Sequence, residues 1–200
     1  TTLANAQPKD YFVDGPIGIY QKLKVTKDAT TNKDVTTTDK AYLYLTMRRG
    51  GRFMYALDVS EPTDPKVLWK ISNSDTGFSE LGQTWSRPRL TLVHVKANAD
   101  ADASTIPVLV FGAGYDPKED NEPPTTNTMG RGIFVVNAET GALIWSATPG
   151  CTKSATCLNV GEMQHAIPSD ISFVDRNNDG KIDKAYFGDL GGNVWRVNMH

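Results

Sequence analysis

"AIPSDISFVDRNNDGKIDKAYFGDLGGNVWRVN", residues 166–198, contains three short runs of β-forming residues separated by turn-forming residues. The runs "DISFV" (170–174), "AYFGD" (185–189) and "NVWRVN" (193–198) are rich in β-branched and aromatic residues, which is typical of strands. A loop rich in Asp and Asn separates the first two runs, and "DLGG" marks a reversal before the third. The stretch therefore predicts a unit of short antiparallel strands.

Two similar units precede this one in the chain. The first comprises "DGPIGIYQKLKV" and "AYLYLTMRRGGRFMYALDV"; the second comprises "SRPRLTLVHV", "PVLVFGAGY" and, after a long insertion, "GRGIFVVNAETGALIWS". A fourth strand follows in each of these units and carries Trp69 or Trp145. Recurrence of four short antiparallel strands at a spacing of roughly 70 to 80 residues indicates propeller blades with long insertions.

The fold class predicted from these units is all-β, as a portion of a modified β-propeller with about three blades and long loop insertions. We expect one partial propeller domain over residues 1–200, with blades at approximately 10–75, 80–149 and 160–200. Trp69, Trp145 and Trp195 recur at related places in the blades, so we expect them to pack between blades.

Composition and charge exclude several classes of function. The chain has 21 basic and 23 acidic residues, a net charge of -2 and no basic stripe, so nucleic acid is not an expected partner. No apolar run is long enough to cross a bilayer. His94, His165 and His200 lack Ser or Asp partners at recognisable spacing, so no catalytic triad is expected. Thr1 opens the chain without Met or a signal-type segment, so we expect a piece of a longer protein.

The loop "DRNNDGKID" (175–183) carries a calcium-binding pattern. In an EF-hand-type loop, oxygen ligands come from positions 1, 3, 5, 7 and 9, with Gly at position 6 and a backbone carbonyl at position 7. The metal ligands predicted at these positions are Asp175, Asn177, Asp179, Lys181 through its carbonyl, and Asp183, with Gly180 at the turn. Tyr186 stands where a bidentate Glu is usual. We expect Ca²⁺ as the cofactor, because this hard ion takes several oxygen ligands without strict geometry.

A weaker version of the pattern occurs one unit earlier. Asn98, Asp100 and Asp102 show the same alternation in "NADADAST", but Ala103 replaces the glycine and Ile106 stands at position 9. We expect a degenerate loop here rather than a second calcium site.

The two cysteines lie close together in "GCTKSATCL". Cys151 and Cys157 have a spacing that suits a small disulfide-closed loop, and no other Cys or nearby Cys/His pair supports a zinc site. We expect a disulfide and an oxidising compartment; two separate free thiols are the alternative.

Several segments together resemble the C-terminal propeller of the PilY family, the PilC-like tip proteins of type IV pili. They are "YFVDG", "RRGGRFMYALDVSEP", "LGQTWSRPRL", "VLVFGAGY", "GIFVVNAETGALIW" and "DRNNDGKIDKAYFGDLGGNVWRVN". The calcium loop followed by "AYFGDLGGNVWRV", and the "TWSRP" entry to the second unit, are the most specific elements.

The resemblance implies a non-enzymatic protein of pilus biogenesis, in which bound calcium regulates pilus extension against retraction, twitching motility and surface attachment. It implies the same five calcium positions, from Asp175 to Asp183. The implied partners are minor pilins, the remaining blades of a longer protein, and host or abiotic surfaces. The implied location is extracellular or on the cell surface, at the pilus tip or outer membrane, with passage through the periplasm.

Two other protein classes share part of the pattern. Quinoprotein dehydrogenases, which use pyrroloquinoline quinone with calcium, have similar strands ending in "ALDVSEP" and "VVNAETGALIW". Their calcium ligands converge on the central channel, whereas the ligands predicted here lie in one contiguous loop. Integrin-α-like adhesion propellers carry similar calcium loops in several blades, whereas only one intact loop occurs here.

Overall fold

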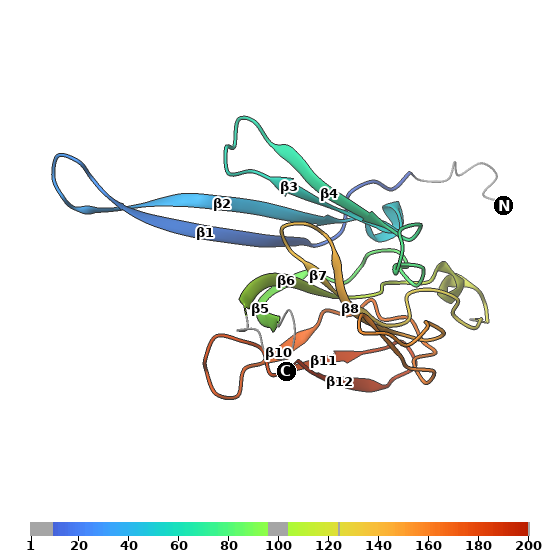
Figure 1. The fold of residues 1–200 in the computed structure, drawn as a ribbon. Helices are drawn as coiled ribbons and strands as arrows, with labels where there is room; N and C mark the ends of the chain where they lie inside the picture. The colour runs from blue at the N-terminus through green and yellow to red at the C-terminus, as the bar shows by residue number, and fades with distance from the viewer. Residues whose placement is uncertain (1–9, 96–103, 124, 200) are drawn as a thin grey trace.

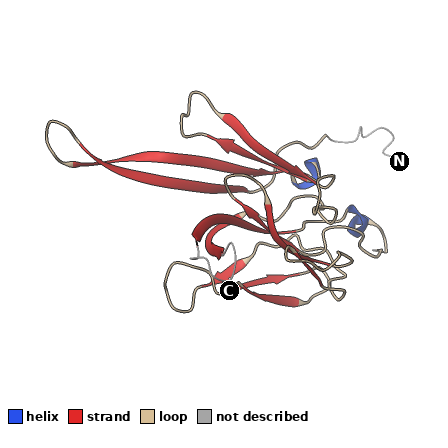
Figure 2. Ribbon diagram, viewed as in Figure 1, coloured by secondary structure: helices blue, strands red, loops and turns tan. Residues whose placement is uncertain are grey.

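The structure is a computed structural model that describes residues 10–95, 104–123 and 125–199. The regular elements of these described residues are strands, which form three sheets, and two short 3₁₀ helices, η1 (Arg48–Gly50) and η2 (Pro117–Asp120). The sheets follow one another along the chain and lie side by side in space (Figures 1 and 2). This arrangement agrees with the prediction of an all-β, partial propeller fold. No helix in the described ranges is long and apolar enough to span a membrane.

The first sheet has four antiparallel strands in the order of the sequence: β1 (Ile17–Lys27), β2 (Asp34–Thr46), β3 (Phe53–Asp58) and β4 (Lys66–Ser72). Its first two strands form a long hairpin that projects well beyond the rest of the molecule (Figure 1). At the hairpin tip, a carboxylate oxygen of Asp28 accepts hydrogen bonds from the N–H groups of Thr30 and Thr31, at 3.0 and 2.7 Å. The hairpin is longer than the apolar pattern predicted, because the Thr-rich residues 34–40 also pair with β1.

The second sheet is the central one. It comprises β5 (Arg89–Val95), β6 (Ser104–Gly112), β7 (Ile133–Asn137), β8 (Leu143–Thr148) and a fifth strand, β9 (Cys157–Asn159), which runs parallel to β8. Sequence patterns did not predict β9. The disulfide between Cys151 and Cys157 is present, as predicted.

The third sheet comprises β10 (Ser172–Val174), β11 (Lys184–Gly188) and β12 (Val194–Asn198), all antiparallel. The strands of the first and third sheets lie within the intervals 10–75 and 160–200 expected for two of the blades, whereas β9 of the second sheet lies outside the expected interval 80–149. The exact blade boundaries remain a prediction.

The core consists of two apolar layers, one on each face of the central sheet. One layer lies between the first and second sheets and contains Trp69, Tyr44 and Phe134. The other lies between the second and third sheets and contains Val135 and Phe187. The strand "IFVVN" is apolar at successive positions because both of its faces are covered.

The three tryptophans assigned to packing between blades lie at these layers. Trp69 is buried between the first two sheets, and its indole Nε1 donates to the carbonyl oxygen of Ala138, in the β7–β8 turn, at 3.2 Å. Trp145 and Trp195 pack partly buried against the layer between the second and third sheets. The predicted packing role is confirmed.

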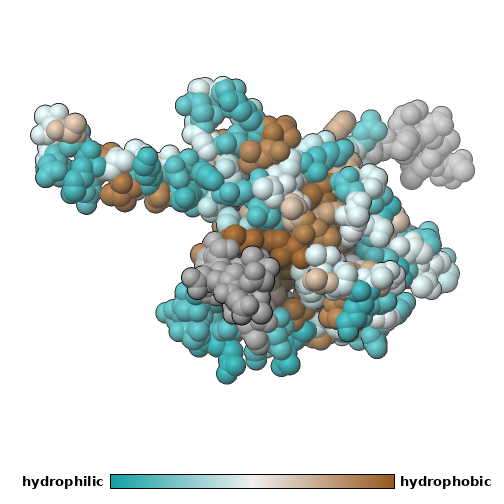
Figure 3. Space-filling model, viewed as in Figure 1, coloured by the Kyte–Doolittle hydropathy of each residue, from teal (hydrophilic) through white to brown (hydrophobic). Residues whose placement is uncertain are grey.

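The projecting hairpin also carries exposed apolar side chains. Ile19, Leu23 and Val25 on β1 are more than half exposed, at 65%, 56% and 61%. Apolar surface of this kind shows as brown on the projecting hairpin in Figure 3. The hairpin therefore presents apolar side chains to solvent.

Candidate metal site

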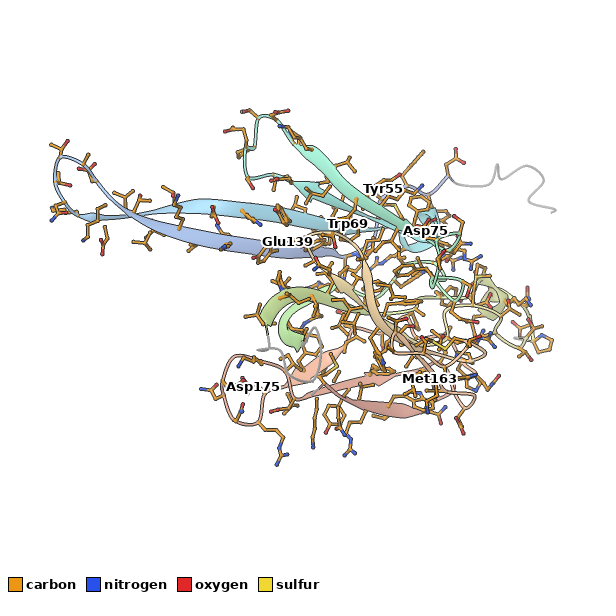
Figure 4. All side chains as sticks on the ribbon, viewed as in Figure 1. Tyr55, Trp69, Asp75, Glu139, Met163 and Asp175 are labelled. Atoms are coloured by element: carbon orange, nitrogen blue, oxygen red, sulfur yellow. A yellow bond between two sulfur atoms is a disulfide. The ribbon has the colours of Figure 1, made fainter. Side chains whose placement is uncertain are left out.

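The loop formed by residues 175–183 joins β10 to β11 at one end of the third sheet, where Figure 4 labels Asp175. The strands on either side are in register, with Val174 opposite Lys184. Asp183 closes the loop, because its N–H donates to the carbonyl oxygen of Val174 at 3.0 Å. The five predicted ligand positions therefore belong to one hairpin loop, as the sequence indicated.

Asp175 organises the first half of the loop. Its Oδ1 accepts a hydrogen bond from the N–H of Asn178 at 2.6 Å, and its Oδ2 accepts one from the N–H of Gly180 at 2.9 Å. Asn178 and Gly180 both have left-handed backbone conformations, with φ of 57° and 81°. A Cβ at Gly180 would meet no atom within 4 Å, so the backbone conformation, rather than a lack of space, favours glycine there.

Asp179 lies in the middle of the loop. Its Oδ1 accepts from the N–H of Lys181 at 2.9 Å, and its Oδ2 lies 3.6 Å from Lys181 Nζ and accepts from Asn177 Nδ2 at 3.3 Å. The hydrogen bond from the Lys181 backbone is the main cause that lowers the pKa of the Asp179 carboxyl. The carboxylate is exposed and ionised at neutral pH.

Asp183 connects the loop to all three strands of the sheet. Its Oδ2 accepts from the N–H of Arg176 at 2.7 Å, and its own carbonyl oxygen accepts from the N–H of Met199, directly after β12, at 2.8 Å. Together with the bond to Val174, these contacts tie β10, the loop and the end of β12 to one residue. Sequence reasoning assigned Asp183 only as a ligand and missed this connecting role, which has no local sequence signal.

The donor chemistry of the loop fits calcium, but its carboxylates do not share one coordination sphere. Asp175, Asn177, Asp179 and Asp183 carry side-chain oxygens, and Lys181 offers its carbonyl. Within the described ranges, no group of three His, Cys, Asp or Glu side chains is close enough to hold a metal ion. Each carboxylate instead accepts N–H groups of the loop itself. Calcium binding therefore stays a prediction.

Other candidate residues lie outside this loop. Asn98, Asp100 and Asp102 fall outside the described residues, as does His200. His165 lies between β9 and β10, away from the loop.

Comparison with known proteins places these features in context. A family model described as "PilY1 beta-propeller domain" matches residues 6–200. A type IV pilus biogenesis factor PilY1 from Pseudomonas aeruginosa is 30% identical over 158 residues, which cover 77% of this chain and 11% of that protein. A PilY1 homolog from Xylella fastidiosa is 28% identical over 156 residues, covering 75% of this chain and 9% of the homolog.

A solved structure has a similar fold. The crystal structure of the Pseudomonas aeruginosa PilY1 C-terminal domain aligns with a TM-score of 0.57 and 24% identity, over 94% of this chain and 30% of that chain. The chain thus spans about a tenth of the length of these curated relatives, which are 11% and 9% covered.

Proposed function

Because the chain belongs to the PilY1 β-propeller family, we propose that it forms part of the propeller of a type IV pilus biogenesis factor. The matched relatives are named as biogenesis factors, which supports a non-enzymatic role. The proposed location is at the cell surface or pilus tip after passage through the periplasm. The proposed partners are minor pilins, further blades of the longer protein, and host or abiotic surfaces.

We further propose that the 175–183 loop binds Ca²⁺, and that calcium occupancy regulates pilus extension against retraction and surface attachment. The observation that carries this proposal is one hairpin loop with an oxygen donor at each of five alternating positions and a left-handed glycine at its turn. The residues that would hold the ion are Asp175, Asn177, Asp179, Asp183 and the Lys181 carbonyl. The ion would add positive charge among three aspartates, of which Asp179 already lies 3.6 Å from Lys181 Nζ.

The position of Asp183 supports a structural effect of binding. Its backbone connects β10 to the end of β12, so a constraint on its side chain acts on the whole third sheet. That sheet packs on the central sheet through Phe187 and Ala185, and through Phe173 beneath the guanidinium of Arg89, which lies 5.1 Å from the ring centre. Calcium would therefore stiffen one blade rather than take part in a reaction.

The affinity expected for this loop is modest. Tyr186 lies in β11 at the position of the usual bidentate Glu, so one strong ligand is lacking. We expect a dissociation constant of about 10⁻⁶ to 10⁻³ M, a range in which environmental calcium changes the occupancy.

Isothermal titration calorimetry with Ca²⁺ tests the binding step. Asp179→Ala is expected to abolish measurable uptake, because it removes the carboxylate at the centre of the loop. Asp64→Ala is the matched control, because Asp64 is an exposed aspartate that pairs with Lys66 beside β4, outside the loop. Unchanged calcium uptake by Asp179→Ala would refute the assignment.

The regulatory step requires a cellular measurement. Pilus extension is compared in cells that express the wild type, Asp179→Ala and Asp179→Lys, while hydrogen exchange is followed over residues 170–190. Asp179→Ala should resemble the calcium-free state, and Asp179→Lys should partly resemble the bound state because it adds positive charge beside Asp175 and Asp183. Equal exchange with and without calcium, or pili indifferent to both changes, would leave no regulatory role.

A further inference from the structure

A cleft lies at the end of the third sheet that is opposite the 175–183 loop. The β10–β11 loop and the β11–β12 turn occupy opposite ends of this antiparallel sheet, and the cleft is next to the turn. Figure 4 shows the separation, with Asp175 at one end and Met163, which precedes the cleft residue Gln164, near the other. The cleft has a volume of about 610 Å³.

Three separate segments build the cleft. The insertion between β6 and β7, the link between β9 and β10, and the β11–β12 turn contribute Glu119, Thr125, Thr126, Asn127, Gln164, His165 and Leu190. Ala166 connects these segments through its backbone. Its N–H donates to Asn127 Oδ1 at 2.7 Å, and its carbonyl oxygen accepts from the N–H of Leu190 at 3.0 Å.

Asn127 carries an unused hydrogen-bond donor. The residue is 3% exposed, and its Nδ2 is the one buried side-chain nitrogen or oxygen in the described part of the chain that has no partner. The amide orientation is fixed, because a flipped amide would place Nδ2 against the N–H of Ala166. Buried donors are almost always paired in proteins, so this nitrogen, on a side chain that lines a cleft, indicates a missing acceptor.

Hydrogen bonds within the protein hold the insertion that carries Asn127. The buried carboxylate of Asp116 accepts from the N–H groups of Lys118 and Thr128, at 3.0 and 2.6 Å. Asp120 accepts two hydrogen bonds from the guanidinium of Arg49, at 2.6 and 3.0 Å. A preformed wall of this kind favours binding, since little conformational entropy is lost on contact.

The lining chemistry selects the ligand class. Glu119 disfavours an anion, and the N–H groups of Asn127 disfavour a cation. The hydroxyls of Thr125 and Thr126 and the amide of Gln164 each offer both donors and acceptors. Such a lining suits ligand hydroxyl groups, which also donate and accept hydrogen bonds. Leu190, 46% exposed, adds an apolar contact at the edge. We propose that the cleft binds a saccharide, and that small side-chain movements at the cleft wall let a hydroxyl or ring oxygen accept from the buried Asn127 Nδ2.

Saturation-transfer difference spectroscopy on the intact protein that carries this chain tests the proposal, with glucose, galactose, mannose and N-acetylglucosamine as probes. We expect transfer to at least one of them, with a dissociation constant of about 1 mM. Asn127→Asp keeps the acceptor for the Ala166 N–H and replaces the free donor with an acceptor, so it should raise that constant at least about tenfold.

Asn159→Asp is the matched control. Asn159 Oδ1 likewise accepts a backbone N–H, from Gly150 at 3.1 Å, but the residue lies at the end of β9, outside the cleft. This variant should bind as the wild type does. The calcium loop shares no residue with the cleft, so the saccharide signal should persist when Ca²⁺ is chelated.

A second variant keeps the proposal testable if Asn127→Asp does not fold. A Cβ at Gly191 would lie 2.1 Å from His165 Cδ2, so Gly191→Ala should displace the imidazole that lines the cleft and also weaken binding. The proposal is overturned if no probe shows transfer up to about 50 mM. It is also overturned if Asn127→Asp and Gly191→Ala fold and bind the saccharide as the wild type does. Binding of neutral peptides at Asn127 without binding of saccharides would overturn it as well.

Discussion

Two buried side chains of the first sheet share one carbonyl group of the central sheet. Tyr44 Oη and Trp69 Nε1 both donate to the oxygen of Ala138, at 3.0 and 3.2 Å, and all three residues are buried. The two rings stack with centroids 5.7 Å apart. Burial also raises the pKa of the Tyr44 hydroxyl, so the group remains a donor at all ordinary pH values.

A double-mutant cycle measures what this sharing contributes. Tyr44→Phe leaves the carbonyl with the Trp69 donor, so it should lower the free energy of unfolding by about 1 kcal/mol. Trp69→Phe removes the other donor and part of a buried ring, at about 2 kcal/mol. The double variant loses both side-chain donors, and leaving the buried carbonyl without them should add about 1 kcal/mol beyond the sum.

The assay is urea unfolding followed by far-ultraviolet circular dichroism, for the wild type, both single variants and the double variant. Tyr55→Phe combined with Trp69→Phe is the control cycle, because Tyr55 lies on β3 with its ring against Phe53, 5.7 Å away, rather than against Ala138. That pair should be additive within about 0.5 kcal/mol. An equal deviation from additivity in the two cycles would show that sharing of the Ala138 carbonyl does not couple Tyr44 to Trp69.

Three further predictions concern the disulfide, a buried carboxylate and pH. Replacing Cys151 and Cys157 with Ala should lower the free energy of unfolding in urea by about 2 kcal/mol, since the closed loop is short; equal stability of the oxidised protein and the variant would contradict this. Asp189→Asn should cost about 2 kcal/mol and change the fluorescence of Trp195, because the carboxylate accepts from the Trp195 indole at 2.8 Å and from the Asn193 backbone at 2.9 Å; unchanged stability and fluorescence would refute that role. Burial raises the pKa of Asp116, but backbone N–H donors led by Thr128 outweigh burial, so the pKa of the carboxyl is lowered. The ionised carboxylate therefore stabilises the folded state fully above about pH 4, and this stabilisation is lost as the pH falls further. Hydrogen exchange at Lys118 and Thr128 should therefore rise in acid for the wild type and depend less on pH in Asp116→Asn; the same acid response in both would argue against Asp116 as the cause.

Strands that bury apolar side chains could be predicted from the sequence, whereas strands held by exposed polar pairing could not. The run "IFVVN" forms β7, which is buried on both faces. Its successive apolar residues predict a strand of this kind. Residues 34–40 are polar except for Val35, and they extend β2 because β1 lies opposite them. The three-residue β9 is too short for any periodicity to reveal.

The candidate site divides in the same way. The loop at 175–183 could be located, because Asp, Asn and Gly at fixed spacing favour a tight turn wherever they occur. The N–H group that donates to each carboxylate could not be predicted from the sequence, because it depends on backbone angles such as those of Asn178. Asn127 gave no signal, because it sits among polar loop residues and is buried through a contact with Ala166, which is distant in the sequence.

The disulfide also decides whether the central sheet can recruit a foreign strand. β9 occupies the outer side of β8 by pairing along Ser146–Thr148, and the bond from Cys157 to Cys151 holds that short strand in position. An unprotected strand of this kind is a template for strand addition by another polypeptide. We therefore expect reduced chains to associate through β8 until oxidation fixes β9, so that the redox state of these cysteines controls association as well as stability.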